Sequence, residues 1–306
     1  MIDSGGLRVG IYVDVENATR NGGRGMRFDV LRDFACRGGG VPIRLNAYLA
    51  YDEDRARLDA DYRDRAASFQ SAFRDYGFKV FQKKVQWYVD EEGRRISKAN
   101  VDLDMAVDML LQSERLDRVV LVSGDGDFAQ VVRALQNRGC RVEIVAFQNV
   151  SKVLRQEGDY FLSGYLVPGL LPVLPASSEG RSWGESGARV RGVCYHYDTV
   201  KKYGFVRYLK TIDGNLLATD TRSRDSAYGS AFFHVSALPS DFDTRPLPSR
   251  EVILEFTLGA GRSNGELAAT DVRIAYIYGG HPPSPAAPPP PGSPPPAVTP
   301  AAIPPA

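Results

Sequence analysis

Apolar residues in the first half of the chain follow two alternating patterns. Short continuous runs of β-branched and aliphatic residues, as at 119–122, are typical of strands buried on both faces. Between these runs apolar residues recur every three or four positions, as in amphipathic helices. The predicted strands cover residues 9–15, 43–51, 78–85, 119–122 and 141–147, the predicted helices cover 28–34, 55–77, 101–111, 128–138 and 151–156, and a hairpin is predicted at 87–96. This alternation indicates an α/β domain with a mostly parallel sheet sandwiched by helices.

The most informative polar cluster follows the fourth predicted strand. There the apolar run gives way to Ser-Gly-Asp-Gly-Asp at 123–127, and helical spacing starts directly afterwards. Asp125 and Asp127 therefore lie at the carboxyl end of a buried strand, the edge where open α/β sheets bind ligands. Considered alone, Asp127 is better explained as a helix N-cap and Asp125 as a turn former. A functional interpretation requires acids from other strands at the same edge.

Two further acids meet that requirement in the predicted topology. Asp14 ends the first strand, and Asp102 lies in the first turn of the helix at 101–111, where a simple capping role is the alternative. A central first strand beside the fourth, as in a flavodoxin-like sheet, brings Asp14 to the acidic turn. Carboxylates ~4 Å apart repel by about 4 kcal/mol at an effective dielectric constant of 20. Mg²⁺ or Mn²⁺ would relieve that repulsion, and either one ion or two would fit.

The acids belong to three ordered motifs: Val-Asp-Val-Glu-Asn at 13–17, Asn-Val-Asp-Leu-Asp-Met-Ala-Val-Asp-Met at 100–109 and Ser-Gly-Asp-Gly-Asp-Phe at 123–128. Together they resemble the NYN domain, a PIN-like nuclease superfamily with LabA-like bacterial members, over roughly residues 7–165. The resemblance implies a PIN-like fold and metal-dependent cleavage of RNA. Asn100 stands where the second motif usually has glycine, which leaves the acid in place.

The resemblance also suggests roles for individual side chains. The residues that it implies as metal ligands, and which we take as catalytic, are Asp14, Asp102, Asp125 and Asp127. It implies that Asn17 lies near the substrate, and we expect Ser123 to contact the substrate as well. Lys98 could hold the phosphate backbone. The arginines that could do the same, although most surface arginines do not, are Arg20, Arg24, Arg27, Arg94 and Arg95.

The pattern of predicted elements changes after residue 189. Five short strands without helices, at 191–197, 204–209, 231–235, 252–258 and 268–277, suggest a small all-β barrel. Aromatic and cationic residues alternate in the first three strands. Strand alternation puts Tyr203 and Phe205 on one face, and Phe232 and His234 on one face of another strand. On the outside of a barrel these rings would stack on unpaired bases, whereas the simpler interpretation places them in the core.

Residues 190–275 also resemble a cold-shock domain, an OB-fold that binds single-stranded RNA or DNA. Lys-Tyr-Gly-Phe-Val at 202–206 and Phe-Phe-His-Val-Ser at 232–236 match its two ribonucleoprotein motifs. The expected nucleic-acid contacts are Lys202 and the stacking residues His196, Tyr203, Phe205, Phe232 and His234. His196 replaces the usual tryptophan of the first strand. The long segment 208–230 could add contacts or cover the face.

Composition and charge restrict the possible partners and the compartment of the protein. The formal net charge is +1, so a nucleic-acid site must be local, and three scattered cysteines suit a reducing compartment. The chain shows no signal peptide and no membrane span, which predicts a cytoplasmic protein without a membrane partner. Residues 282–306 hold 13 of the 20 prolines, so we expect a disordered tail that could bind a protein partner. The expected domains are 1–167 (nuclease), 168–189 (linker), 190–278 (barrel) and 279–306 (tail).

These patterns favour a metal-dependent endoribonuclease whose cold-shock-like barrel captures single-stranded RNA. A non-catalytic RNA-binding regulator is the first alternative, although a pure scaffold has no reason to carry four repelling acids. A DNA nuclease with the same acids is the second, because single-stranded DNA fits both domains. PIN-like domains often pair, so a homodimer is a further expectation.

Overall fold

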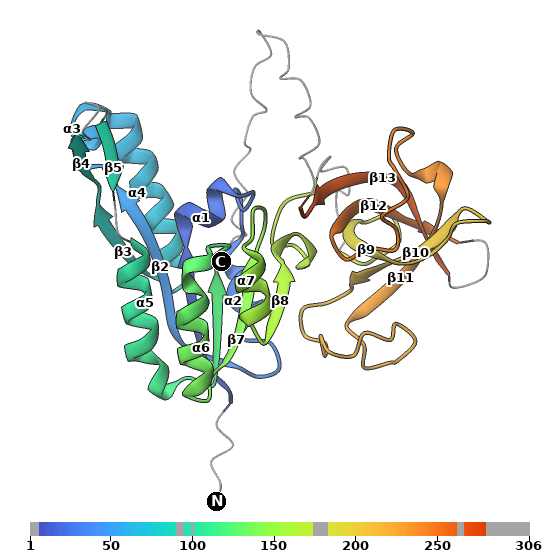
Figure 1. Ribbon diagram of the computed structural model, residues 1–306, viewed down its shortest axis with the longest axis horizontal. Helices are drawn as coiled ribbons and strands as arrows, with labels where there is room; N and C mark the ends of the chain where they lie inside the picture. Colours follow the sequence, from blue (N-terminus) through green and yellow to red (C-terminus); the bar gives the residue numbers. More distant parts are fainter. Residues whose placement is uncertain (1–5, 90–94, 99–100, 174–182, 262–265, 280–306) are drawn as a thin grey trace, which may run out of the picture.

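The computed structural model describes residues 6–89, 95–98, 101–173, 183–261 and 266–279, which form two domains that lie against each other (Figure 1). The first domain contains a six-stranded parallel sheet in the order β3-β2-β1-β6-β7-β8. The strand bounds are β1 (Arg8–Asp14), β2 (Val41–Tyr51), β3 (Lys79–Lys84), β6 (Arg118–Val122), β7 (Arg141–Ala146) and β8 (Tyr160–Ser163). The predicted parallel sheet is confirmed, with β8 as a strand that the sequence pattern did not predict.

Strand β1 lies between β2 and β6 and pairs with both in parallel. Counted without the hairpin, the sheet order is 3-2-1-4-5-6, a doubly wound order that differs from the 2-1-3-4-5 of flavodoxin. The predicted contact between the first and fourth strands is confirmed. The switch point between β1 and β6 therefore carries Asp14 on one strand and the acidic turn after the other.

Helices cover both faces of this sheet, and Figure 1 shows α5, α6 and α7 on one of them. The helix bounds are α1 (Val15–Arg20), α2 (Phe28–Ala35), α3 (Glu53–Leu58), α4 (Ala60–Asp75), α5 (Val101–Gln112), α6 (Ala129–Asn137) and α7 (Lys152–Glu157). Side chains that alternate along β1 pack into two hydrophobic cores, one on each face of the sheet. Ile11 and Val13 pack with residues of α2, whereas Tyr12 packs with residues of α5 and α6.

Two sequence predictions in this domain need correction. The helix predicted at 55–77 is interrupted at Asp59, whose carboxylate accepts a hydrogen bond from the Tyr62 backbone N–H at 2.8 Å and so caps α4. The edge strand β8 was missed because it has four residues, too few for a periodic pattern. The predicted hairpin is confirmed as β4 (Gln86–Val89) and β5 (Arg95–Lys98), and its connection at 90–94 lies outside the described residues.

The second domain is a closed five-stranded barrel in the order β10-β11-β13-β12-β9. Its strands are β9 (Arg189–Asp198), β10 (Tyr203–Leu209), β11 (Tyr228–His234), β12 (Val252–Ala260) and β13 (Leu267–Ile277). All five predicted strands are confirmed. Numbered within the barrel, the closed order is 1-2-3-5-4, with strands 3 and 5 parallel, which is consistent with the OB-fold.

The two domains share apolar contacts. One core cluster contains residues of the first domain together with Val193, Ile253 and Tyr276 of the barrel. Within the segment predicted as a linker, Leu170 is buried in that cluster, and Trp183 donates a hydrogen bond to the Leu209 carbonyl at 2.7 Å. The described parts of this segment therefore pack on the domains that they join. Among the helices in the described ranges, none combines the length and apolar character needed to cross a bilayer.

Candidate active site and nucleic-acid interface

Asp14 lies where β1 ends and α1 begins. Its Oδ1 accepts a hydrogen bond from the Asn17 backbone N–H at 3.0 Å, and its Oδ2 accepts one from the Ser123 hydroxyl at 3.1 Å. Only 5% of the residue is exposed. Burial, together with the negative charges of Asp102 and Asp125, raises the pKa of Asp14 to about 6, although both hydrogen bonds act to lower it. Within the part of the chain that the structure describes, its ionised form has no ion-pair partner.

The acidic turn after β6 is tied to the end of β1 by two side chains. The Ser123 hydroxyl bridges them, because it donates to Asp14 and accepts a hydrogen bond from the Asp125 backbone N–H at 3.1 Å. The Asn17 side-chain oxygen accepts a hydrogen bond from the Gly124 backbone N–H at 2.9 Å. Ser123 is 1% exposed, so the structure places it behind the acids as a positioning group. Asn17 likewise clamps the two strand ends together.

Asp125 and Asp127 differ in how much of their carboxylate is engaged. Asp125 Oδ1 caps the short 3-10 helix η2 (Gly126–Phe128) by accepting a hydrogen bond from the Asp127 backbone N–H at 3.0 Å. Asp127 is not a helix N-cap, because α6 begins at Ala129 and Asp127 lies within η2. The Asp127 side chain is exposed, and within the described residues its carboxylate has no hydrogen-bond or ion-pair partner. Among the described side chains, none therefore competes with a ligand for this carboxylate.

Asp102 brings the second motif to the same edge from the first turn of α5. Partial burial of its carboxyl raises the pKa of Asp102, and the negative charges of Asp125, Glu16 and Asp127 raise it further. All four predicted acids thus share one electrostatic environment. Glu16 was missed as a member of this group, although it lies in the first motif beside Asp14. It also forms an ion pair with Arg20 one helical turn away.

The donor chemistry fits a hard divalent cation, since the side chains at this edge offer carboxylate oxygens. Within the described ranges, however, no three acidic, histidine or cysteine side chains lie close enough together to enclose an ion by themselves. Mg²⁺ usually keeps several waters and is bound through one or two carboxylates, so a hydrated ion needs no such enclosure. Lys98 ends β5, and its side chain lies outside the described residues.

The barrel carries a continuous group of outward-facing rings, here called the aromatic platform. Its members, from β9, β10 and β11, are Tyr195, His196, Tyr203, Phe205 and Phe232. Neighbouring ring centroids are 5.7 to 6.4 Å apart. The interpretation of the predicted stacking residues as core is wrong, because Tyr197 and Phe233 fill the interior instead. The platform lies mainly on the second and third barrel strands, the face that OB-folds use for oligonucleotides.

A β-bulge adds Tyr195 to this platform. Phe205 of β10 pairs with His196 of β9, but the next residue, Val206, pairs with Cys194, so Tyr195 is the extra residue. Simple alternation would turn Tyr195 and His196 to opposite faces, yet both are exposed. The stacking set taken from the cold-shock resemblance did not include Tyr195. Its hydroxyl lies 2.9 Å from the Ser230 hydroxyl, which fixes the ring at the margin of the platform.

The two other predicted contacts lie at the ends of the same strands. Lys202 is exposed in the turn before β10, with a left-handed backbone (φ 59°). His234 is exposed at the end of β11, and its Nδ1 lies 2.9 Å from the Ser236 hydroxyl. The structure therefore places every predicted contact of the barrel on its outer surface near the platform.

A doubly wound sheet with four acids at its switch point, followed by an OB-type barrel, defines a PIN-like domain joined to a module of the kind that binds single strands. The family model of the NYN domain matches residues 8–171, and the chain belongs to this family of PIN-like nucleases. This membership supports a hydrolase in general and suggests an RNA-related function.

Two known proteins are similar to this chain. The low amplitude and bright protein LabA of Synechococcus elongatus is 29% identical over 97 residues, which is 31% of this chain and 52% of that protein. The chain therefore spans about half the length of this curated relative. A crystal structure of a protein of unknown function from Vibrio parahaemolyticus is 24% identical, with a TM-score of 0.44, and the match covers 53% of this chain and 96% of that one.

Proposed function

We propose that this protein is a divalent-cation-dependent endoribonuclease that captures single-stranded RNA on the aromatic platform. It would hydrolyse the RNA at the sheet edge that carries Asp14, Asp102, Asp125 and Asp127, here called the acidic edge. One observation carries the proposal: the charges of Asp102 and Asp125 act on the buried Asp14, so three motifs far apart in the sequence converge on one sheet edge. Within the described residues the ion pair of Glu16 with Arg20 is the only one at this edge, so the repulsion between the other acids remains. A bound cation would remove it, and membership of a nuclease family supports the same conclusion.

Asp102 and Asp125 would hold a hydrated Mg²⁺ or Mn²⁺. Such an ion polarises a phosphodiester and lowers the pKa of a water molecule when bound. The chain's own residues would prepare the edge for this chemistry. Asn17 and Ser123 fix the Asp14 carboxylate, which is ionised at neutral pH because its pKa is about 6. The free carboxylate of Asp127 would orient the attacking water and accept its proton.

The platform would bind single-stranded RNA without selecting a sequence. Stacking a base on an aromatic side chain contributes about 1–3 kcal/mol, and every base has a face that can stack. Phe205 neighbours the other four rings, with centroids 5.8 Å from Phe232, 6.0 Å from Tyr203 and from His196, and 6.4 Å from Tyr195, so it lies at the centre of the platform. Lys202 would add a cation for the backbone. RNA is preferred over DNA as the substrate because of the family, since both nucleic acids present the same stacking faces.

A non-catalytic RNA-binding regulator is the second candidate. The observation that favours it is that, in the described part of the chain, no three carboxylates lie close enough to enclose an ion. The buried Asp14 is the opposing observation, because a regulator gains nothing from a carboxylate whose ionised form is disfavoured.

The test is cleavage of a labelled single-stranded RNA and of the matching DNA, with Mn²⁺, with Mg²⁺ and with a chelator. We expect cation-dependent cutting of the RNA by the wild type, and no cutting by Asp125→Asn. RNA that binds equally well to both proteins and remains intact would support the regulator. Equal cutting of RNA and DNA would replace the ribonuclease with a general nuclease.

A further inference from the structure

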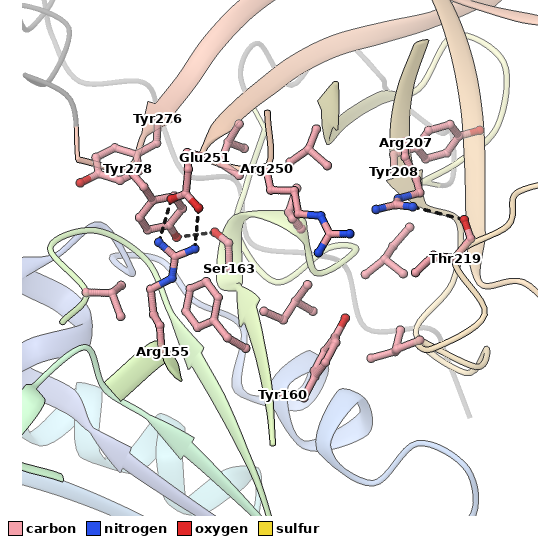
Figure 2. A pocket seen from close by; sticks show the side chains of 18 of the residues that line it. Arg155, Tyr160, Ser163, Arg207, Tyr208, Thr219, Arg250, Glu251, Tyr276 and Tyr278 are labelled. Carbon is pink, nitrogen blue, oxygen red and sulfur yellow. Dashed lines mark hydrogen bonds and ion pairs between the residues drawn. The ribbon is translucent and has the colours of Figure 1, made fainter. Parts of the chain in front are cut away.

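A cavity of about 1070 Å³ lies between the two domains (Figure 2). One wall consists of α7 and β8 of the first domain, and the other consists of strands and loops of the barrel. Its volume is at the upper limit of the ~300–1,000 Å³ typical of small-molecule pockets. None of the acids or platform rings named above as predicted contacts lines it. The proposed function therefore leaves this cavity without a role.

The cavity is much more positive than the protein as a whole. Its charged lining residues are Lys152, Arg155, Arg207, Arg250 and Glu251. Glu251 is neutralised by Arg155 through two hydrogen bonds of 2.7 and 2.8 Å. Within the described ranges the other three cations have no ion-pair partner, whereas the whole chain has a formal net charge of only +1. Three uncompensated cations around one cavity favour a polyanion.

Arg207 connects the cavity to the aromatic platform. It lies two residues after Phe205 on the outward face of β10, and alternate residues of a strand are ~7 Å apart. Its guanidinium lies 5.7 Å from the ring centroid of Tyr195 and 5.2 Å from that of Tyr228. Tyr195 belongs to the platform and Tyr228 lines the cavity. A strand whose bases stack on Phe205 would therefore bring its next phosphates close to Arg207, which lines the cavity.

A loop that lines the cavity also contacts the acidic turn. Asn149 and Val150 line the cavity, and their loop contacts the turn. The Ser151 backbone N–H donates to the Gly124 carbonyl at 2.9 Å, and a Cβ on Gly124 would lie 3.3 Å from the Val150 Cα. The barrel fixes this loop, because the Asn149 backbone N–H donates to the Tyr276 hydroxyl at 3.3 Å. The loop at 149–151 thus connects the cavity lining, the barrel and the acidic turn.

We propose that the interdomain cavity guides the sugar–phosphate backbone of single-stranded RNA from the aromatic platform to the acidic edge. This inference rests on the proposed function, because it requires RNA on the platform. Figure 2 shows Arg250 projecting into the cavity between Arg155 and Arg207. Arg207, Arg250 and Lys152 are the backbone contacts. Contacts to phosphate carry no sequence information, so the path accepts any sequence that the platform accepts.

Binding of short and long RNA to the full chain tests this path. Fluorescent oligouridines of about four and about twelve nucleotides probe the platform alone and the platform with the cavity, since an OB-fold covers ~4–16 nucleotides. The variants are Arg250→Ala and Lys152→Ala, both of exposed side chains. Each should make the salt slope for the longer RNA shallower by ~0.7, which is about fivefold in affinity between 1 M and 0.1 M salt. The shorter RNA should bind both variants as it binds the wild type.

The matched control is Arg245→Ala, an exposed arginine of the barrel that pairs with Asp243 and does not line the cavity. It should leave both affinities unchanged. If the cavity variants bind the longer RNA with the wild-type affinity and salt slope while Phe205→Ala weakens binding, the path is wrong and capture on the platform stands. If Phe205→Ala changes nothing either, the proposed function fails with it.

A photoreactive uridine, moved along the longer RNA, gives the position of each nucleotide. Crosslinks from internal nucleotides to residues 149–152 are expected. Crosslinks confined to the barrel at every position would overturn the path.

Discussion

The acidic edge and the aromatic platform are energetically unfavourable for opposite reasons. At the edge, charge is buried: Asp14 is 5% exposed, and its neighbours are also acids. On the platform, apolar area is exposed: Tyr195 is 41% exposed and lies among other rings. Buried charge is stabilised by a counter-ion, and exposed aromatic area is stabilised by a flat apolar partner. The two kinds of unfavourable surface would therefore take different ligands, a cation at the edge and a base on the platform.

The two sites also differ in the interactions that hold their side chains in place. The acids depend on the topology, because Ser123 and Asn17 join the ends of two strands that are more than 100 residues apart in the sequence. The rings depend on strand alternation and one bulge within neighbouring strands. Substitutions at the edge should therefore affect chemistry and stability together, whereas substitutions on the platform should affect binding alone.

The largest effect is expected for Asp102→Asn, which should lower the cleavage rate about 10³-fold, the upper end for loss of one electrostatic group in an active site. RNA affinity should not change, because the platform is intact. The matched control is Asp104→Asn on the same helical turn, whose partner is Lys83 at 2.6 Å. An exposed pair of this kind contributes at most ~1 kcal/mol to stability. Equal losses of cleavage in both variants would show that the acids of α5 act only through folding.

Asp14→Asn should change the stability of the protein as well as its chemistry. Burial raises the pKa of Asp14 in the folded protein to about 6, above its ordinary value, so the folded state holds the proton more tightly. The resulting stability is present below about pH 4 and is lost as the pH rises through 6. Two pKa units correspond to about 3 kcal/mol. In chelator, Asp14→Asn should therefore be up to ~3 kcal/mol more stable than the wild type at pH 8, and equally stable at pH 4.

Urea unfolding at the two pH values measures this difference. Mn²⁺ at pH 8 should stabilise the wild type more than Asp14→Asn. Asp117 provides a control of opposite sign, because its hydrogen bonds with Arg8 lower the pKa of Asp117 to about 2. Asp117→Asn should destabilise the protein at pH 8. The difference in unfolding free energy between the wild type and Asp14→Asn should grow between pH 4 and pH 8. If the difference stays constant, the interpretation of Asp14 as a buried charge is wrong.

The smallest effect is expected for Phe205→Ala, which should weaken binding of a four-nucleotide RNA about 30-fold, or ~2 kcal/mol for the loss of one stacking surface. Cleavage at saturating RNA should stay at the wild-type rate. Tyr76→Ala removes an exposed ring of the first domain and should leave the affinity unchanged. Fluorescence anisotropy measures both. Unchanged affinity in Phe205→Ala would mean that the rings do not contact RNA.

Much of the fold could be predicted because its patterns are local. The run at 119–122, the acidic turn and the spacing of α5 follow from residues within a few positions of one another. The parallel sheet and the five barrel strands were predicted in this way, whereas the contact between β1 and β6 was predicted from the strand order of doubly wound sheets. β8 was missed because four residues give no period, and the break at Asp59 was missed because the apolar spacing continues across it.

The candidate site was less predictable, since burial and charge depend on distant partners. The sequence indicated that Asp14, Asp102 and Asp125 would share an edge, but not that Asp14 would be buried or that Glu16 would join them. It placed Tyr203 and Phe205 on one face, but could not locate the bulge that turns Tyr195 outward, because a bulge is defined by the partner strand.

By itself, then, the sequence determined the elements, the order of the motifs and the kind of chemistry that their side chains carry. The tertiary structure alone decided how the two domains meet. The bond from Asn149 to Tyr276 joins residues 127 positions apart, and the cavity beside it is lined from both domains. Local patterns depend on neighbours along the chain, whereas a cavity exists only where two folded surfaces fail to fill the space between them.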